Sequence, residues 1–314
     1  MPCLLMGAGV INYTEEQIKY LQRIENRVFR QLLGGLGDTP IAILRGEVGA
    51  SMVRTRIIQA RLMLTKSIID GDNLLLKTIL TNIRRLGGGR WYGLLSRYLQ
   101  DVGLTFDELE TMGKSDVWKR IRDYDDKEWA KDMDKLTDRA IYKTYKKGVG
   151  GSWGYDNSVE SDLLFQVRSN SLRVNAWYRH VGDEVGCKLC GAALENLEHF
   201  ILYCPSLNTA RDDRLIMEVG GVGTDQEKVG RLVYDRGRIG EVKKMLGKLW
   251  RERLYRLGKA RATAATRVNH KKLGKGRGGN ANSNPVDTAS VGTAVTTSVR
   301  PRRRGTCYAL GRWG

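Results

Sequence analysis

The stretch "CKLCGAALENLEHFILYC", residues 187–204, holds three of the five cysteines and one of the three histidines in this chain of 314 residues. Its spacing is C-x2-C-x8-H-x4-C. Two thiols separated by two residues can meet on a tight turn, and a following helix-like segment returns an imidazole and a third thiol to the same point. The spacing therefore predicts a tetrahedral zinc site made by Cys187, Cys190, His199 and Cys204.

Four protein ligands leave no position for water on such an ion, so we expect one structural Zn²⁺ rather than a hydrolytic one. A zinc deaminase would need a glutamate two residues after a ligand and a downstream Pro-Cys-x-x-Cys, and the stretch lacks that order. Two other interpretations stay open: a disulfide pair beside a core histidine, or reduced buried cysteines. Lys188 would lower the pKa of the neighbouring thiols. The apolar residues of the stretch predict a small core that the metal holds together: Leu194, Leu197, Phe200 and Ile201.

The chain is strongly basic, with a net charge of +18 and a pI of about 9.8. This charge favours a polyanionic partner, nucleic acid more readily than an anionic membrane surface. Hydrophobic residues make up 41% of the chain, which is enough for a buried core. No run approaches the roughly 18 apolar residues of a membrane helix, and the N-terminus lacks the features of a signal peptide. We expect an intracellular protein, nuclear or cytoplasmic, with no membrane partner.

The segment "NYTEEQIKYLQRIENRVFRQLL", residues 12–33, predicts an amphipathic helix, because its apolar residues recur every three or four positions. Thr14 and Gln17 form a capping box at its start, and Gly34 with Gly35 ends it.

Capping residues predict the starts of two further helices. Thr39 and Pro40 predict an N-cap followed by a proline at the first helical position, and Thr105 with Glu108 predicts another capping box.

Ser51 is expected to cap a long helix that extends to about Ile69. On this helix Arg54 and Arg61 fall on one side, while apolar residues such as Ile57 fall on another. We expect the apolar side to pack and the basic side to contact phosphates, although a solvated basic face fits the pattern equally well.

The predicted fold class is mainly α, in three parts. Residues 1–150 form a helical N-terminal domain, residues 151–258 a small zinc-knuckle segment with flanking helices, and residues 259–314 a disordered basic tail. The glycine-rich segment 148–154 is the expected hinge. The tail contains twelve Lys and Arg residues and a single acid, Asp287, with too few apolar residues to fold.

Two basic clusters in the tail are candidate contacts to RNA or single-stranded DNA. They are Lys271 and Lys272 in "NHKKLGKGRGG", and Arg302, Arg303 and Arg304 in "RPRRRG". Such runs bind the phosphate backbone without reading sequence, but they also serve as nuclear-import signals or have no role.

Beside the metal site, Lys188 is a further candidate phosphate contact. The aromatic residues Trp177, Tyr178, Phe200 and Tyr203 would either stack on bases or fill the core around the metal.

The knuckle and its trailing "PSLNTARDDR" resemble the zinc-binding segment near the C-terminus of reverse transcriptases from non-LTR (LINE-type) retrotransposons. The preceding "LLFQVRSNSLRVNAWYRH" resembles the stretch that usually precedes that knuckle. Residues 13–69 are similar to the thumb-like region that follows the polymerase palm in these proteins. The blocks occur in the family's order and cover roughly residues 1–210.

In that family the fingers and palm come before the thumb-like region and carry the Mg²⁺-binding aspartates around an aromatic-x-Asp-Asp turn. This sequence starts at Met1, past those segments, so we expect no polymerase activity. Tyr124, Asp125 and Asp126 imitate the turn, but the aromatic residue stands one position too close, and we interpret the three as an exposed helix face.

Asp235, Glu241 and Lys243 imitate the acid and Glu-x-Lys spacing of a restriction-like nuclease. The apolar residues around them recur at helical spacing, so the pattern favours an amphipathic helix over a nuclease strand.

We therefore expect a zinc-binding fragment, derived from such a reverse transcriptase, that binds RNA or single-stranded DNA and is not an enzyme. The alternative is a non-catalytic helical interaction protein, or an inert remnant, in which zinc only supports the fold.

Overall fold

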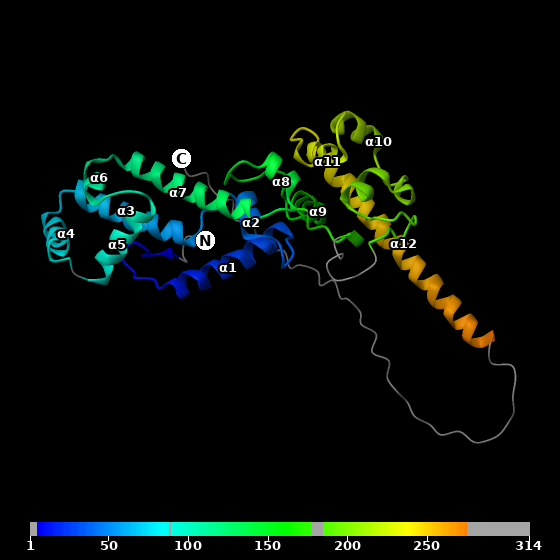
Figure 1. Ribbon diagram of the computed structural model, residues 1–314, viewed down its shortest axis with the longest axis horizontal. Coiled ribbons are helices and arrows are strands. Elements are labelled where there is room, and N and C mark those ends of the chain that lie inside the picture. The colour runs from blue at the N-terminus through cyan, green and yellow to red at the C-terminus, as the bar shows by residue number, and fades with distance from the viewer. Residues whose placement is uncertain (1–4, 88, 177–184, 275–314) are drawn as a thin grey trace, which may run out of the picture. The chain divides into compact units, whose positions relative to one another are not determined.

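The computed structural model describes residues 5–87, 89–176 and 185–274, with residues 259–274 described as backbone only. Every regular element in these ranges is a helix (Figure 1), which confirms the mainly α fold class. None of these helices combines the length and apolar character needed to cross a membrane. The α-helices are α1 (Glu15–Leu33), α2 (Ile41–Val48), α3 (Val53–Asp70), α4 (Leu74–Leu86), α5 (Arg90–Asp101), α6 (Phe106–Thr111), α7 (Lys114–Asp134), α8 (Ala140–Tyr145), α9 (Val159–Arg168), α10 (Asp213–Leu215), α11 (Asp225–Tyr234) and α12 (Ile239–Gly274). The π-helical turns η3 (His199–Tyr203) and η5 (Ile216–Gly220) and the 3₁₀ turn η4 (Pro205–Leu207) lie between α9 and α11.

Both predicted capping boxes are confirmed. At the start of α1, the Thr14 hydroxyl accepts the Gln17 N–H at 3.2 Å, and the Gln17 side chain accepts the Thr14 N–H at 2.9 Å. Thr105 and Glu108 make the same reciprocal pair at the start of α6. Gly34 ends α1 at a φ of 66°, a left-handed conformation that costs glycine little.

Two predicted helix starts were wrong by one or two residues. Pro40, not Thr39, is the N-cap of α2, because the ψ of Pro40 is 141° and the helix begins one residue later, at Ile41. Helix α3 starts at Val53 with Met52 as its cap and without a side-chain cap. A distant residue does the capping instead, because the Gln22 side chain accepts the Val53 N–H at 2.9 Å. Ser51 is therefore not needed as a cap.

Helix α3 is central to the N-terminal part of the chain and contacts α1, α4, α5, α6 and α7. Ile57, Ile58 and Leu62 are fully buried and point to different sides of the helix. A helix surrounded by others buries polar residues along with apolar ones, so the expected division into one packed and one basic face was wrong.

A buried ion pair joins α2, α3 and α7. Arg45 donates to the Asp125 carboxylate at 2.8 Å, and both side chains are buried. The same carboxylate oxygen accepts the Thr55 hydroxyl at 2.7 Å. Asp125 stands on a helix as expected, but its carboxylate is an internal acceptor, so the interpretation of an exposed face was wrong for this residue.

The apolar core has three clusters that follow the chain. The first surrounds α3 and includes residues of α5 and α7, and the second joins α1, α2 and α7 to Tyr142 of α8 and Phe165 of α9. The third contains other residues of α9, two of the predicted metal ligands, and residues of α11 and α12. Because α8 and α9 each contribute to the second and third clusters, these two helices link the N-terminal helices to the metal-ligand segment.

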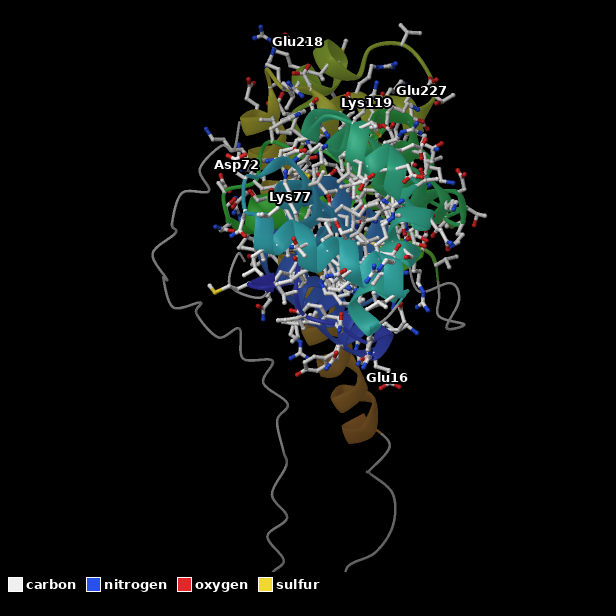
Figure 2. The ribbon with its side chains drawn as sticks, turned by 90° about the vertical axis from the view of Figure 1, so that its left-hand side faces the viewer. Glu16, Asp72, Lys77, Lys119, Glu218 and Glu227 are labelled. Atoms are coloured by element: carbon white, nitrogen blue, oxygen red, sulfur yellow. The ribbon has the colours of Figure 1, made fainter. Side chains whose placement is uncertain are left out.

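Helix α4 is held much more loosely than α3. Leu80 is its one buried residue. Figure 2 labels Lys77 of α4 and the exposed Asp72, which lies just before the helix. Asn73 caps the helix by accepting the Leu76 N–H at 3.1 Å.

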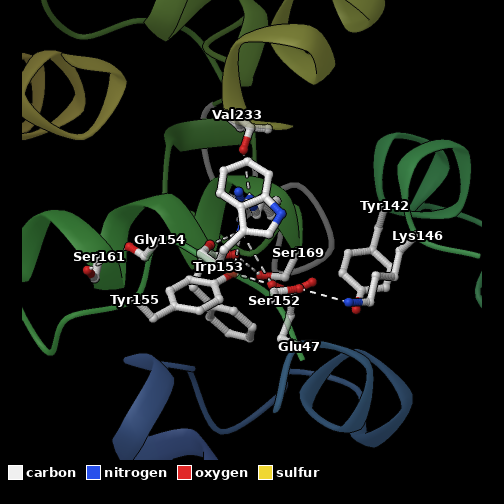
Figure 3. Close-up of polar contacts among 12 residues, drawn as sticks. Glu47, Tyr142, Lys146, Ser152, Trp153, Gly154, Tyr155, Ser161, Ser169 and Val233 are labelled. Carbon is white, nitrogen blue, oxygen red and sulfur yellow. Dashed lines mark hydrogen bonds and ion pairs between the residues drawn. The ribbon is translucent and has the colours of Figure 1, made fainter. Parts of the chain in front are cut away.

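The expected hinge at residues 148–154 is bonded to helix α2. The Ser152 N–H donates to the Glu47 carbonyl at 2.8 Å (Figure 3). The Glu47 carboxylate accepts the Tyr155 hydroxyl and lies 3.5 Å from the guanidinium of Arg168, which also donates to a carbonyl of α11. The glycine-rich segment is thus bonded to α2 through Ser152, and the Glu47 carboxylate also joins α2 to α9.

The division of the chain also differs from the expected one. The described residues up to Thr263 group as one compact unit, and within them no division falls near residue 150. Helix α12 continues past residue 258 to Gly274, so the first part of the segment expected to be disordered is helical. Its sequence "KARATAATRVNHKK" is rich in alanine, lysine and arginine, which favour helix. The remainder of that segment lies outside the described residues.

We predict that Asp125→Ala lowers the free energy of unfolding by about 3–5 kcal/mol, because it leaves the buried Arg45 charge without its partner. Urea denaturation followed by circular dichroism measures the change. Asp123→Ala removes a nearby exposed carboxylate of the same helix and serves as the control, for which we expect a change within about 0.5 kcal/mol. Equal effects of the two variants would contradict the assigned role of Asp125.

Candidate metal centre

The four predicted ligands come together. One ligand atom from each of Cys187, Cys190, His199 and Cys204 lies within 4.8 Å of all the others. The Cys187 and Cys204 sulfurs are 3.8 Å apart, and the Cys190 sulfur lies 3.4 Å from His199 Nε2. Zinc–sulfur bonds of about 2.3 Å in a tetrahedron separate two sulfurs by about 3.8 Å. The donor set and its spacing therefore fit a tetrahedral metal ion.

The three thiols of the site are free, and their separations exclude a disulfide, in which the sulfurs are about 2.05 Å apart. The disulfide interpretation was therefore wrong.

A tight turn presents the first two cysteines. The Gly191 N–H donates to the Cys187 carbonyl at 2.9 Å, and the Cys187 N–H donates to the Ala192 carbonyl at 2.7 Å. Gly191 closes the turn at a φ of 80°, which a residue with a side chain adopts at a cost. The backbone N–H groups of Cys190 and Leu189 point at the Cys187 sulfur, where they favour the thiolate form that binds metals.

The π-helical turn η3 presents the other two ligands. Residues five apart on an α-helix lie about 140° apart around the axis, too far to share a ligand position. In η3 the Cys204 N–H donates to the carbonyl of His199, five residues back, at 2.8 Å. This wider turn brings positions i and i+5 to one side. The H-x4-C spacing and the π turn thus go together, because both place His199 and Cys204 on the same side of the turn.

A buried carboxylate lies next to the ligands. Glu195 accepts two hydrogen bonds from Arg253 of α12, both at 2.8 Å, and a third from the Asn175 N–H at 3.0 Å. One of its oxygens lies 3.9 Å from the Cys187 sulfur. The guanidinium neutralises this carboxylate beside the thiols and ties α12 to the metal loop.

Protonation of the ligands follows from their burial. Burial raises the pKa of Cys187 above the usual thiol value, and burial together with the neighbouring Cys187 raises the pKa of Cys204 to about 12. Burial lowers the pKa of His199, which keeps its imidazole neutral and able to bind a metal. The effect that opposes burial at Cys187 comes from backbone N–H groups and not from Lys188, whose side chain is exposed.

The predicted small core is present. Leu197, Phe200 and Ile201 are buried, and Leu194 is half-buried. The Phe200 ring meets the edge of Trp250 on α12 at 5.9 Å between centroids. Phe200 is therefore a core residue and cannot stack on a base.

The structure rules out one predicted phosphate contact and restricts another. Arg61 is fully buried, and its guanidinium donates to the carbonyls of Ile11 at 2.7 Å and Trp91 at 3.2 Å, so no phosphate reaches it. Arg54 is half-buried and pairs with Glu15 at 2.6 Å and Asp101 at 2.9 Å. The expectation of a phosphate-binding face on α3 was wrong for Arg61.

Several predicted contacts fall where the structure gives no side chains. Lys271 and Lys272 lie in the backbone-only part of α12. Trp177, Tyr178, Arg302, Arg303 and Arg304 lie outside the described residues.

The nuclease-like residues are engaged elsewhere. Lys243 donates to Asp156 at 2.6 Å, and Glu241 accepts from Arg238 at 2.6 Å, both within the first turns of α12. The prediction of a helix rather than a strand at Glu241 and Lys243 is confirmed.

Sequence reasoning missed Glu195 and Arg253, and it gave no separate role to Arg211, which lies in the segment "PSLNTARDDR" after the knuckle. Arg211 donates to the carbonyls of Ile201 at 2.9 Å and Cys204 at 2.7 Å, which fixes the chain after the last ligand. Arg253 follows Leu249 by four positions, so it falls in phase with the buried apolar side of α12. A charged residue at a position on the apolar side of a helix is the signal that could have predicted a buried ion pair.

Comparison with known proteins finds no family model, no curated protein and no solved structure that matches this chain.

We predict that Zn²⁺ binding to the metal-free chain releases protons and strengthens as pH rises. The raised pKa values of Cys187 and Cys204 mean that these two thiols carry protons near pH 7 in the absence of metal, and each must lose its proton to coordinate. Two released protons correspond to an affinity gain of about a hundredfold per pH unit. Calorimetry in buffers of different ionisation enthalpy counts the protons, and a pH-independent affinity would contradict the thiolate site.

We predict that Arg253→Met weakens zinc binding by about 10- to 100-fold, because Glu195 is left as an uncompensated charge beside the thiols. A competition titration with a zinc-sensitive chromophore measures the affinity. Arg251→Met is the matched control, since Arg251 is exposed and pairs with Glu160 at 2.9 Å. If both variants bind zinc equally well, Glu195 and Arg253 do not support the metal loop.

Proposed function

We propose that this chain is a zinc-stabilised nucleic-acid-binding fragment, related to the C-terminal part of non-LTR retrotransposon reverse transcriptases, with RNA or single-stranded DNA as its partner. The ion is Zn²⁺ in a structural role. The observation that carries the proposal is an exposed basic stripe on α12 beside the metal loop.

The stripe consists of Lys244, Lys248 and Arg251, at helical spacings of four and three residues, and all three are exposed. The opposite side of α12 packs into the core through Val242 and Leu249. Among the described residues, Lys244 and Lys248 make no ion pair, which leaves their charge available to phosphates.

The stripe lies close to the last metal ligand. Lys244 and Lys248 line a shallow cavity of about 290 Å³ together with Arg211, which holds the Cys204 carbonyl. The acids Asp212, Asp213 and Glu241 also line this cavity, so we expect phosphates to contact the lysine side chains from solvent and not to enter it.

The metal supports the proposed surface through a direct chain of contacts. Arg253 is two residues beyond Arg251 on α12 and donates two hydrogen bonds to Glu195, which lies between the metal ligands in the sequence. A metal ion that orders the loop thereby orders the helix that carries the stripe. The exposed Lys188 on the knuckle is a further candidate phosphate contact.

We also propose that the chain has no catalytic activity of its own. Four protein ligands occupy the coordination positions of a tetrahedral ion, and the Asp125 carboxylate is engaged by Arg45 and Thr55.

We predict that the zinc-loaded chain binds a labelled 20-nucleotide single-stranded RNA with an affinity that falls steeply with salt. Lys244→Glu combined with Lys248→Glu should lower the affinity at least tenfold, and should reduce the slope of log affinity against log salt by about one to two. Fluorescence anisotropy at several salt concentrations measures both quantities.

The matched control reverses two exposed lysines of α7, Lys119→Glu with Lys127→Glu, which changes the net charge equally. Lys119 is labelled in Figure 2. An equal loss in both pairs would mean that overall charge, not the stripe, drives binding. Absence of RNA binding by the zinc-loaded chain would overturn the proposal and favour a helical interaction protein in which zinc only supports the fold.

A further inference from the structure

A groove of about 800 Å³ is lined by the metal loop and by the segment that follows α9. Leu172 and Val174 of that segment and Leu197 of the loop line it, and all three are buried core residues. Because these residues belong to the packed core, the groove is preformed. The half-buried Leu194 and Ala176 add apolar surface that a ligand can cover.

Three carboxylates from separate segments also line the groove. They are Asp38, before α2; Asp138, before α8; and Glu198, before η3. Asp38 and Asp138 are exposed, and Glu198 is half-buried. Among the described residues, Asp38 and Glu198 make no ion pair, whereas Asp138 pairs with Arg139 at 3.0 Å. The groove is therefore an acidic region of a chain whose net charge is +18.

Arg139 is the basic residue among the described residues that line the groove, and its charge is already engaged. Its guanidinium donates to the Asn170 carbonyl at 2.7 Å and pairs with Asp138, and its side chain is 10% exposed. Three carboxylates against one guanidinium leave an excess of negative charge in the lining. Such a groove attracts a cationic ligand and repels the phosphates of a nucleic acid.

Two asparagine side chains in the lining are each fixed at one end by a hydrogen bond. The Asn170 amide nitrogen donates to the Asp138 carbonyl at 3.0 Å, and the Asn196 amide oxygen accepts the His199 N–H at 2.8 Å. Within the described part of the chain, the Asn170 amide oxygen and the Asn196 amide nitrogen make no further hydrogen bond. The groove thus offers one acceptor and one donor, which are the two groups that the backbone of a bound peptide needs.

We propose that the groove binds an extended peptide segment of a partner protein that carries lysine or arginine side chains. The alkyl stems of these side chains pack on Leu194 and its apolar neighbours, and their charged ends reach Asp38 and Glu198. The Asn170 amide oxygen accepts a peptide N–H, and the Asn196 amide nitrogen donates to a peptide carbonyl. This partner is cationic, whereas the proposed partner of the α12 stripe is anionic, so the two surfaces select different ligands.

Fluorescence anisotropy with the full zinc-loaded chain, in the absence of nucleic acid, tests the proposal. The probe is a fluorescein-labelled, amidated peptide of sequence ALRVKRLA. The control peptide, ALQVQQLA, has glutamine in place of each basic residue. We expect saturable binding of the basic peptide and at least tenfold weaker binding of the control, because the control cannot pair with the carboxylates.

Asp38→Asn combined with Glu198→Gln should weaken binding of the basic peptide at least tenfold, because both unpaired carboxylates lose their charge. The matched control is Asp72→Asn with Asp123→Asn, which changes the net charge equally at two exposed acids that do not line the groove. This control should change the affinity by less than about twofold, since salt screens distant charges. Zinc content and circular dichroism verify that each variant is folded.

A charge-neutral variant separates a peptide site from a general cation site. Asn170 has a φ of 48°, which glycine adopts readily, so Asn170→Gly removes the amide and keeps the turn. It should weaken peptide binding about two- to tenfold, the worth of one hydrogen bond.

Four results would each overturn the proposal. They are no saturable peptide binding up to about 200 μM protein, an equal loss in both pairs of acid variants, unchanged binding to the Asn170→Gly variant, and displacement of the peptide by equimolar spermidine.

Discussion

A buried guanidinium and a buried carboxylate, on Arg253 and Glu195, connect the metal loop to the long helix α12. Neither charge would tolerate its position alone, because each is almost completely removed from water. Together they hold the carboxylate beside the Cys187 thiol and the helix against the loop. Phe200 of the loop and Trp250 of α12 also make an apolar contact at this interface. The ion pair and this apolar contact together hold α12 against the metal loop.

Buried arginines recur elsewhere in the fold. Arg45, Arg61 and Arg168 are among its largest fully buried side chains, and each meets a carboxylate or backbone carbonyls. Part of the net charge of +18 therefore serves the interior and never reaches a partner. The rings of Trp153, Tyr155 and Tyr234 surround the Arg168 guanidinium, which adds cation–π attraction to its hydrogen bonds. Formal charge overstates the basic surface of such a protein.

Features that depend on residues close together in the sequence could be predicted from it. Features that depend on partners far away in the sequence could not. The capping boxes at Thr14 and Thr105 need only a residue three positions away, and the four ligands lie within eighteen residues. By contrast, the start of α3 depends on Gln22, and the burial of Asp125 depends on Arg45, 80 residues earlier. The helical periodicity of α3 could not reveal that neighbours surround it, since periodicity reports which residues share a side and not what covers each side.

A π turn is an α turn with one extra residue, so η3 shows that ligand convergence outweighs helical regularity at this point. Its extra residue also sets the rotational phase of everything that follows. Deleting one residue between His199 and Cys204 would restore the α-helical repeat, but would turn the following chain by about 100°. Arg211 would then lose the carbonyls of Ile201 and Cys204. The number of residues between these two ligands is thus fixed at four. An insertion or a deletion between them would displace the chain that follows Cys204.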